Sequence, residues 1–310
     1  MALTDSYIID IGQELTLRGT PRAKQFLELL RAQQYVKNIF VFAPLFFGLQ
    51  LGNRELLWDT VLAFVAFSLA ASGVYLLNDC LDVAEDRQHP SKKSRPIASG
   101  VISIRFAITL SVSLFAASGW LMAWLSFQGA VILGAYVLLN IAYSVLLKHI
   151  AILDVAIIAT GFVLRLFVGA AVTDIKLSVW IVVITFLLAL FLALSKRRVD
   201  VLLFVQTGAK ARKAIDGYNL RFLDSAMSIM ASVVIVSYIL YTTSAEAINE
   251  LDNNYLYLTA LFVILGILRY MQIALVDEDS GSPTDIFWRD RFIQIISMCW
   301  VLVFAWNLYL

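Results

Sequence analysis

Long apolar stretches dominate this chain and restrict its fold more than any other feature. We predict nine membrane-spanning helices, each near the roughly 20 residues needed to cross a bilayer. Hydrophobic residues make up 60% of the chain and charged residues 15%, against roughly 45–50% and about 25% in soluble domains. A soluble core could not bury this much apolar surface, so we expect an all-α, polytopic membrane bundle. The predicted spans are residues 36–52, 56–77, 103–125, 128–147, 150–172, 177–195, 223–245, 255–276 and 291–309.

The distribution of lysine and arginine predicts the orientation of the bundle. Cytoplasmic loops of membrane proteins are enriched in these two residues. With nine spans, 21 of the 24 Lys and Arg residues fall on the side of the N-terminus, two fall on the other side, and Arg165 lies within a span. We therefore expect a cytoplasmic N-terminus and an external C-terminus.

The N-terminal region is expected to differ from the rest of the chain. We predict a cytoplasmic segment over residues 1–35 and a catalytic membrane domain over residues 36–310. Within the first segment, apolar residues such as Phe26 and Leu30 stand among charged ones. This pattern suits a helix that lies in the membrane interface, and it suits equally a solvated helix that leads into the first span.

A run of acidic residues follows the second predicted span. If the helix continues through it, Asp79, Asp82 and Asp86 lie at positions i, i+3 and i+7, on one face, with Asn78 four residues before Asp82. Like charges on one face repel unless a cation lies between them. Oxygen ligands suit Mg²⁺, which is often shared with substrate phosphates. We therefore predict Mg²⁺ as cofactor; a solvated acidic helix end is the plain alternative, although acids there oppose the helix dipole.

Cations follow these acids directly. Lys92, Lys93 and Arg95 lie in a loop that Pro90 and Pro96 stiffen. Acids, Mg²⁺ and cations together meet the needs of a diphosphate leaving group, because they neutralise the charge that grows as its C–O bond breaks. Part of this basic character also reflects the ordinary composition of cytoplasmic loops.

These residues resemble the signature of the UbiA superfamily of intramembrane prenyltransferases. Its first aspartate-rich motif, N-D-x-x-D-x-x-x-D, matches Asn78, Asp79, Asp82 and Asp86. Residues 95–100 match its R-P-[IL]-x-S-G tail, and residues 143–148 match its Y-S-x-x-L-K element. Residues 31–38 resemble its first-helix signature, with Tyr35 where that signature usually has Trp. The resemblance covers nearly the whole chain and implies the nine-helix UbiA fold.

The second aspartate-rich motif of most members departs from the family pattern here. The corresponding loop reads Ser195-Lys196-Arg197-Arg198-Val199-Asp200, with one acid after three cations. This loop resembles the phosphoribosyltransferase branch of the superfamily, which acts on decaprenyl phosphate, although Ser195 and Asp200 replace that branch's Gly and Glu. Further residues that resemble this branch are His89, Pro90, Lys92, Thr207, Gly208, Arg212, Lys213 and Tyr218.

The resemblance implies transfer of 5-phosphoribose from 5-phosphoribosyl diphosphate to a polyprenyl phosphate of the decaprenyl type, with release of diphosphate. The donor is anionic at two ends, and the loops 87–95 and 196–213 offer cations at two places. The attacking phosphate is already an anion, so catalysis can rest on metal, positioning and electrostatics without a general base. The alternative is a prenyltransferase that moves a prenyl chain from prenyl diphosphate to an aromatic acceptor.

Roles follow from the motifs and the resemblance. The predicted catalytic residues are Asn78, Asp79, Asp82 and Asp86, with the three aspartates as metal ligands. Asp154 and Arg165 share a face of the fifth predicted span, where an ionisable residue is costly and a functional candidate by default; for Arg165, pairing within the bundle is an equal alternative. The predicted substrate-binding residues are Tyr35, Lys37, Lys92, Arg95, Tyr143, Lys148, Asp154, Lys196, Arg197 and Arg198.

The expected surroundings follow from the same features. Besides the two substrates, we expect the protein to contact the lipid bilayer and no nucleic acid. The sequence leaves open whether it forms a homo-oligomer. We expect a multi-pass protein of the inner (cytoplasmic) membrane whose active site faces the cytoplasm. Transport is disfavoured because the polar residues cluster in the cytoplasmic connections and form no path across the bilayer. The resemblance further implies a product that serves cell-wall synthesis.

Overall fold

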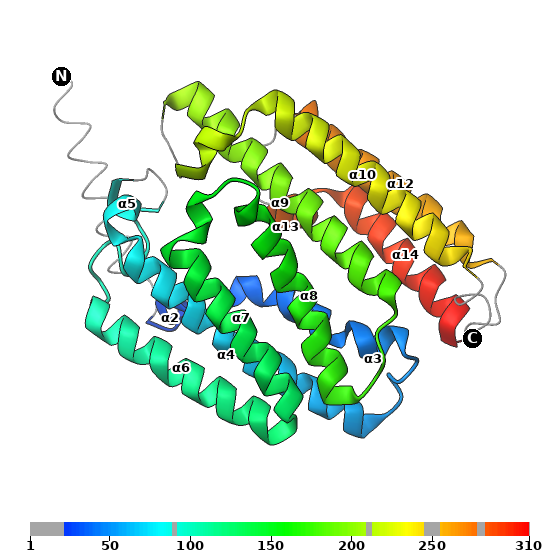
Figure 1. Cartoon of the computed structure of the whole chain (residues 1–310), viewed down its shortest axis with the longest axis horizontal. Coiled ribbons are helices and arrows are strands. Elements are labelled where there is room, and N and C mark those ends of the chain that lie inside the picture. The colour runs from blue at the N-terminus through cyan, green and yellow to red at the C-terminus, as the bar shows by residue number, and fades with distance from the viewer. Residues whose placement is uncertain (1–21, 89–91, 209–212, 245–254, 278–282, 310) are drawn as a thin grey trace.

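The computed structural model of this chain is a helical bundle throughout the part that it describes, residues 22–88, 92–208, 213–244, 255–277 and 283–309 (Figure 1). These ranges contain no strand, so the prediction of an all-α fold is confirmed for them. The α-helices are α2 (Arg22–Leu29), α3 (Ala43–Phe47), α4 (Arg54–Leu81), α5 (Val83–Gln88), α6 (Ile104–Leu125), α7 (Phe127–Val145), α8 (Leu153–Thr173), α9 (Val179–Thr207), α10 (Leu220–Thr242), α12 (Ala260–Leu275), α13 (Pro283–Arg289) and α14 (Arg291–Tyr309). The 3₁₀ helices are η1 (Ala32–Phe42), η2 (Leu147–His149), η3 (Lys213–Gly217) and η4 (Leu256–Thr259).

Seven helical segments of the described chain are long and apolar enough to cross a membrane. They are α4, α6, α7, α8, α9, α10 and the joined segment of η4 and α12, and each corresponds to a predicted span. The apolar part of α14, Arg291–Asn307, is shorter. The chain is therefore an integral membrane protein, whereas the count of nine spans and the orientation stay predictions.

Side-chain caps mark where several long helices begin. The first turn of a helix leaves backbone N–H groups unpaired, and Asn or Ser just before it can accept their hydrogen bonds. Five helices of the bundle begin in this way, so short polar residues between the apolar runs define the helix ends. The capping residues are Asn53 for α4, Ser103 for α6, Ser126 for α7, Ser178 for α9 and Asn219 for α10.

The predicted span 36–52 is not a continuous α-helix. It is replaced by η1 and the short helix α3, and an 11-residue 3₁₀ helix is unusual because such helices seldom exceed about 3–4 residues. η1 packs against α8 and α4 in the middle of the bundle (blue in Figure 1). A Cβ atom at Gly169 of α8 would lie 2.1 Å from the carbonyl oxygen of Val41. This close contact packs the η1 backbone at Val41 against α8, and irregular backbone at membrane depth is tolerated where protein buries it.

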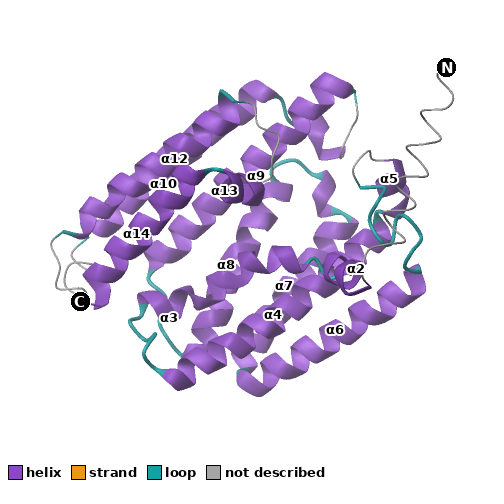
Figure 2. Cartoon of the chain, turned by 180° about the vertical axis from the view of Figure 1, so that it is seen from behind, coloured by secondary structure: helices purple, strands orange, loops and turns teal. Residues whose placement is uncertain are grey.

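Two apolar clusters hold the bundle together, and α8 takes part in both. One cluster includes Phe67 of α4 and Val168 of α8, and the other includes Phe191 of α9 and Val155 of α8. Figure 2 shows α8 between α7 and α9, in agreement with its contacts to both. Because α8 joins the two clusters, it fixes the α4 side of the bundle relative to the α9 side.

Candidate active site

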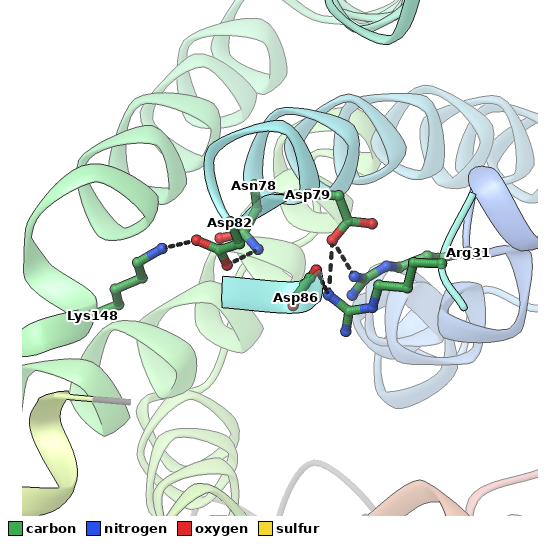
Figure 3. Close-up of polar contacts among 7 residues, drawn as sticks. Arg31, Asn78, Asp79, Asp82, Asp86 and Lys148 are labelled. Carbon is green, nitrogen blue, oxygen red and sulfur yellow. Dashed lines mark hydrogen bonds and ion pairs between the residues drawn. The ribbon is translucent and has the colours of Figure 1, made fainter. Parts of the chain in front are cut away.

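The chain interrupts its helix in the middle of the acidic motif. α4 ends at Leu81, Asp82 has a non-helical backbone with φ −91° and ψ 6°, and α5 begins at Val83. The predicted common face of the three aspartates assumed a continuous helix, and that assumption is wrong. Figure 3 shows the result: Asp79 and Asp86 contact arginines on one side, whereas Asp82 contacts Lys148 on the other.

Asp79 and Asp86 share one guanidinium group. The Nη1 atom of Arg95 lies 3.2 Å from Oδ1 of Asp79 and 2.6 Å from Oδ2 of Asp86, and Arg31 forms a second ion pair with Asp79 (Figure 3). Both aspartates are buried, with 7% and 3% of their surface exposed. A buried carboxylate is costly unless it is paired. This half of the motif is therefore built around positive charge.

Asp82 joins the acidic motif to the end of α7. Lys148, a buried residue of η2, forms an ion pair with Asp82, and Nδ2 of Asn78 donates a hydrogen bond to Oδ2 of Asp82 at 2.9 Å. The ion pair between Lys148 and Asp82 connects two motifs that lie 66 residues apart in the sequence. Asn78 thereby fixes the direction of the Asp82 carboxylate.

The donor set fits Mg²⁺ best between Asp79 and Asp86. Among the residues described by the structure, no group of three or more His, Cys, Asp or Glu side chains could hold a metal ion. Asp79 and Asp86 nevertheless converge on one cation, the Arg95 guanidinium. Mg²⁺ often takes only one or two carboxylates and completes its shell with water and substrate phosphates. The arrangement thus suits two of the three predicted ligands, while Lys148 engages Asp82.

Arg197, predicted to bind substrate, lies in a buried ion-pair network. Its side chain is 1% exposed. Its Nε atom lies 2.5 Å from Oδ2 of Asp154, which is fully buried, and the same guanidinium pairs with Asp200. A side chain this enclosed and already paired has no free face for a soluble substrate. The structure therefore favours a positioning role for both Arg197 and Asp154.

Arg198 and Lys196 occupy different surroundings from Arg197. Arg198 is also buried: its Nε atom lies 2.6 Å from Oδ1 of Asp224, and its Nη1 atom donates to the carbonyl of Ala274 at 2.8 Å. Lys196 is exposed. Of the three consecutive cations, only Lys196 has the exposure needed to meet a substrate from solution.

A short segment, residues 147–154, connects the two halves of the site. Lys148 near its start reaches the acidic motif, and Asp154 at its end reaches α9. Tyr218 holds this segment: its hydroxyl donates to Oδ1 of Asp154 at 2.6 Å and accepts from the backbone N–H of Ile152 at 2.6 Å. Ile152 has a φ of 72°, a strained value for a β-branched residue. Burial, followed by the hydrogen bond to Asp154, raises the pKa of Tyr218 well above its usual value.

η1 is fixed beside α4 by two polar contacts. The hydroxyl of Tyr35 lies 2.8 Å from Oγ of Ser72, and Nδ2 of the buried Asn38 donates to Oγ of Ser68 at 2.9 Å. Lys37 lies between these two anchors and is partly exposed. The first-helix signature therefore places Lys37 on η1, which packs against α4 and α8.

Arg165 finds its partners within the bundle, the alternative that the sequence left open. Its Nε atom donates to Oδ1 of Asn38 at 2.9 Å, and Nη1 donates to the carbonyl of Gly161 at 2.7 Å. Cation–π attraction adds to these hydrogen bonds. Three aromatic rings have their centres 4.8 to 5.3 Å from its guanidinium carbon, those of Phe67, Tyr136 and Phe162.

Some site residues were predicted and others were missed. Lys92 and Tyr143, both predicted to bind substrate, are partly exposed and interact with other residues. Arg31 and Tyr218 stood in recognised motifs without a predicted role. Their aspartate partners lie 48 and 64 residues away, and no local pattern in the sequence indicates pairs at such separations.

The fold and the site define a class of membrane transferase. A helical membrane bundle carries an interrupted aspartate motif beside two partly buried arginines and a buried lysine. The model of the UbiA prenyltransferase family matches residues 41–296, and the chain belongs to that family. It is therefore a transferase by family.

Similar proteins carry a more specific name. The decaprenyl-phosphate phosphoribosyltransferase of Corynebacterium glutamicum is 33% identical over 93% of this chain and 88% of its own length. The protein of the same name from Mycolicibacterium smegmatis is 34% identical over 89% of each chain. The sequence is thus similar to these two proteins over almost its entire length.

Solved structures agree with the fold. A UbiA homolog from Archaeoglobus fulgidus bound to GPP and Mg²⁺ superposes with a TM-score of 0.69 at 17% identity, covering 91% of this chain and 98% of that one. The same homolog bound to DMAPP and Mg²⁺ gives a TM-score of 0.69 at 19% identity, covering 92% and 100%. At these identities the likeness establishes the architecture alone.

Proposed function

We propose that this enzyme transfers 5-phosphoribose from 5-phosphoribosyl diphosphate to a polyprenyl phosphate of the decaprenyl type. The observation that carries the proposal is the one-third identity to decaprenyl-phosphate phosphoribosyltransferases over about nine-tenths of the chain. The run of cations at residues 196–198 of α9, in place of a second aspartate motif, supports the same reaction.

The reaction balances without a proton transfer. An oxygen of the acceptor phosphate forms a bond to the anomeric carbon of ribose, the bond from that carbon to the diphosphate oxygen breaks, and the electron pair leaves with diphosphate. Mg²⁺, held by Asp79 and Asp86, would neutralise charge on the departing group. Arg95, which pairs with both aspartates in the structure, would bind diphosphate oxygens once the metal takes its place between them. Lys148, held by Asp82, adds positive charge on the other side.

We assign different roles to the three consecutive cations of α9. Lys196 is exposed, and we assign it to the second phosphate of the donor. Arg197 and Arg198 hold α9 through their buried ion pairs, and Asp154 belongs to the same framework. Lys92, in the loop after α5, adds to the charge around the donor.

The cytoplasm is the proposed side for this chemistry. A water-soluble phosphorylated sugar is available there, and the predicted orientation places most Lys and Arg residues on that side. The protein would then lie in the inner (cytoplasmic) membrane with its active site facing inward, and its product would enter cell-wall synthesis.

A transfer assay with purified protein tests the proposal. Radiolabelled 5-phosphoribosyl diphosphate is incubated with decaprenyl phosphate, with Mg²⁺ or with excess EDTA, and label in the lipid phase is measured. We expect Mg²⁺-dependent transfer of label. Failure to transfer label, together with prenylation of an aromatic acceptor from prenyl diphosphate, would refute the proposal in favour of ordinary prenyl transfer.

A further inference from the structure

Lys37 differs from most of the other cations near the site. In the described part of the chain it forms no ion pair and no hydrogen bond through its side chain, although it is only partly exposed. A cation in the protein interior is costly unless an anion accompanies it. Each of the comparable cations contacts an aspartate: Arg31, Arg95, Lys148, Arg197 and Arg198.

The surroundings of Lys37 carry an excess of positive charge. Arg165 and Arg31 both act on it with like charge, and Asp285 of α13 acts with opposite charge. Arg165 does not relieve the excess, because its own partners among the described residues are neutral groups and aromatic rings. The surroundings of Lys37 are therefore suited to an anion beyond those that the described residues supply.

Lys37 is separated from the aspartate pair along the direction of α4. The Ser72 anchor of η1 lies seven residues before Asp79 on this helix, which corresponds to about 10 Å of rise. In a displacement at the anomeric carbon, the attacking group approaches the face opposite the leaving diphosphate. The two anions therefore need cations at two separate places, and Lys37 provides one away from the Asp79–Asp86 pair.

An apolar region adjoins Lys37. Phe40, three residues further along η1, packs edge-on against Phe162 of α8 with ring centres 5.2 Å apart, and Val41 is fully buried. A polyprenyl phosphate has one anionic head and a long apolar chain. Its chemistry matches a cation next to aromatic and aliphatic side chains, whereas the soluble donor has no apolar part.

We propose that Lys37 binds the phosphate of the acceptor lipid, with Arg165 of α8 adding positive charge. The inference rests on the proposed function and adds to it a separate site for the second substrate. The donor is assigned to the acidic motif and Lys196, and the acceptor phosphate to the side chain of Lys37 on η1.

Steady-state kinetics of a matched set of variants tests this division. In Lys37→Gln we expect the KM for decaprenyl phosphate to rise by about 10-fold or more, the loss expected for a charge-assisted hydrogen bond, while the KM for 5-phosphoribosyl diphosphate stays near the wild-type value. Lys37→Arg keeps the charge and should restore most of the lipid affinity. Lys176→Gln, in the α8–α9 loop and far from the site in sequence, is the control for loss of one lysine. Because Lys37 pairs with no described carboxylate, its replacement leaves no buried anion and the variant should fold.

A binding measurement separates the phosphate from the lipid chain. Farnesyl phosphate and farnesol are titrated into wild-type protein and Lys37→Gln in detergent, without donor. We expect wild type to prefer the phosphate by about 10-fold or more, and Lys37→Gln to bind both probes with similar affinity. Retention of the full preference in Lys37→Gln would overturn the inference.

The two proposals fail in different ways. If wild-type protein transfers label and Lys37→Gln raises only the KM for 5-phosphoribosyl diphosphate, Lys37 belongs to the donor site and this inference is refuted while the proposed function stands. If wild-type protein transfers no label but prefers farnesyl phosphate through Lys37, the proposed reaction is refuted and the lipid-phosphate site stands.

Discussion

Replacement of Arg197 by alanine distinguishes a structural from a substrate-binding role for the cations of α9. Arg197 is 1% exposed and pairs with Asp154, which is 0% exposed. Removing one partner of a buried ion pair costs roughly 3–5 kcal/mol, because the remaining charge stays buried and uncompensated. We expect Arg197→Ala to lose stability of this order. Lys196→Ala, an exposed site on the same helix, should change stability by about 0.5 kcal/mol or less.

The assay is chemical unfolding in mixed micelles, followed by tryptophan fluorescence, combined with kinetics on the protein that stays folded. A double variant provides the sharpest control. Replacing both members of a buried pair by apolar residues is often neutral, so Asp154→Leu combined with Arg197→Met should recover much of the stability lost in Arg197→Ala. The coupling energy from the cycle that is closed by the single variants Asp154→Leu and Arg197→Met should be large.

A different pattern would refute the reasoning. If Arg197→Ala unfolds like wild type and raises the KM for 5-phosphoribosyl diphosphate much more than the KM for the lipid, then Arg197 contacts the donor directly. The sequence alone predicts that result, and the buried ion pair argues against it.

Three further predictions concern the acidic motif, the contact between α8 and η1, and the hydrogen bond of Tyr218 to Asp154. Asp86→Asn keeps the shape of a proposed metal ligand but removes its charge, so kcat should fall at least about 100-fold; near-normal turnover in the radiolabel assay would exclude it as a ligand. Gly169→Ala places a Cβ 2.1 Å from the carbonyl oxygen of Val41, so η1 must move. We expect a lower melting temperature and reduced transfer of label. The control is Gly134→Ala of α7, because a Cβ there meets no atom within 4 Å. Tyr218→Phe removes the donor to Asp154 and should cost roughly 1–3 kcal/mol of stability, measured by the same unfolding assay; an unchanged value would show that Tyr218 does not stabilise the 147–154 segment.

The apolar periodicity of the sequence predicts the helices well and their interruptions poorly. Seven predicted spans correspond to observed helices, because crossing hydrocarbon imposes a length and a composition that are visible locally. The span at 36–52 was predicted by the same rule and is instead η1 with α3. Hydropathy identifies an apolar segment but does not distinguish a continuous α-helix from a 3₁₀ helix followed by a short α-helix.

The sequence indicates which residues form the candidate site but not how they are arranged. Their spacing predicts Asp79, Asp82 and Asp86 on one helix face, but α4 ends at Leu81 and Asp82 contacts Lys148 instead. Three adjacent cations looked equivalent, yet burial and distant acids give Arg197 a different environment from Lys196. Such differences arise from contacts between residues far apart in sequence, which no local motif contains.

The uncharged partners that surround Arg165 bear on the order in which the protein assembles. An arginine near the middle of an apolar helix costs roughly 2.5–3.5 kcal/mol on membrane insertion. Its partners in other elements, Asn38, Phe67 and Tyr136, all precede α8 in the chain and so leave the ribosome first. The receiving site is therefore complete when α8 arrives, and co-translational insertion can deliver Arg165 directly from the translocon into a polar contact. A chain whose first 50 residues are deleted would lack Asn38 and should retain α8 poorly in the membrane, a defect of biogenesis that arises before any substrate is met.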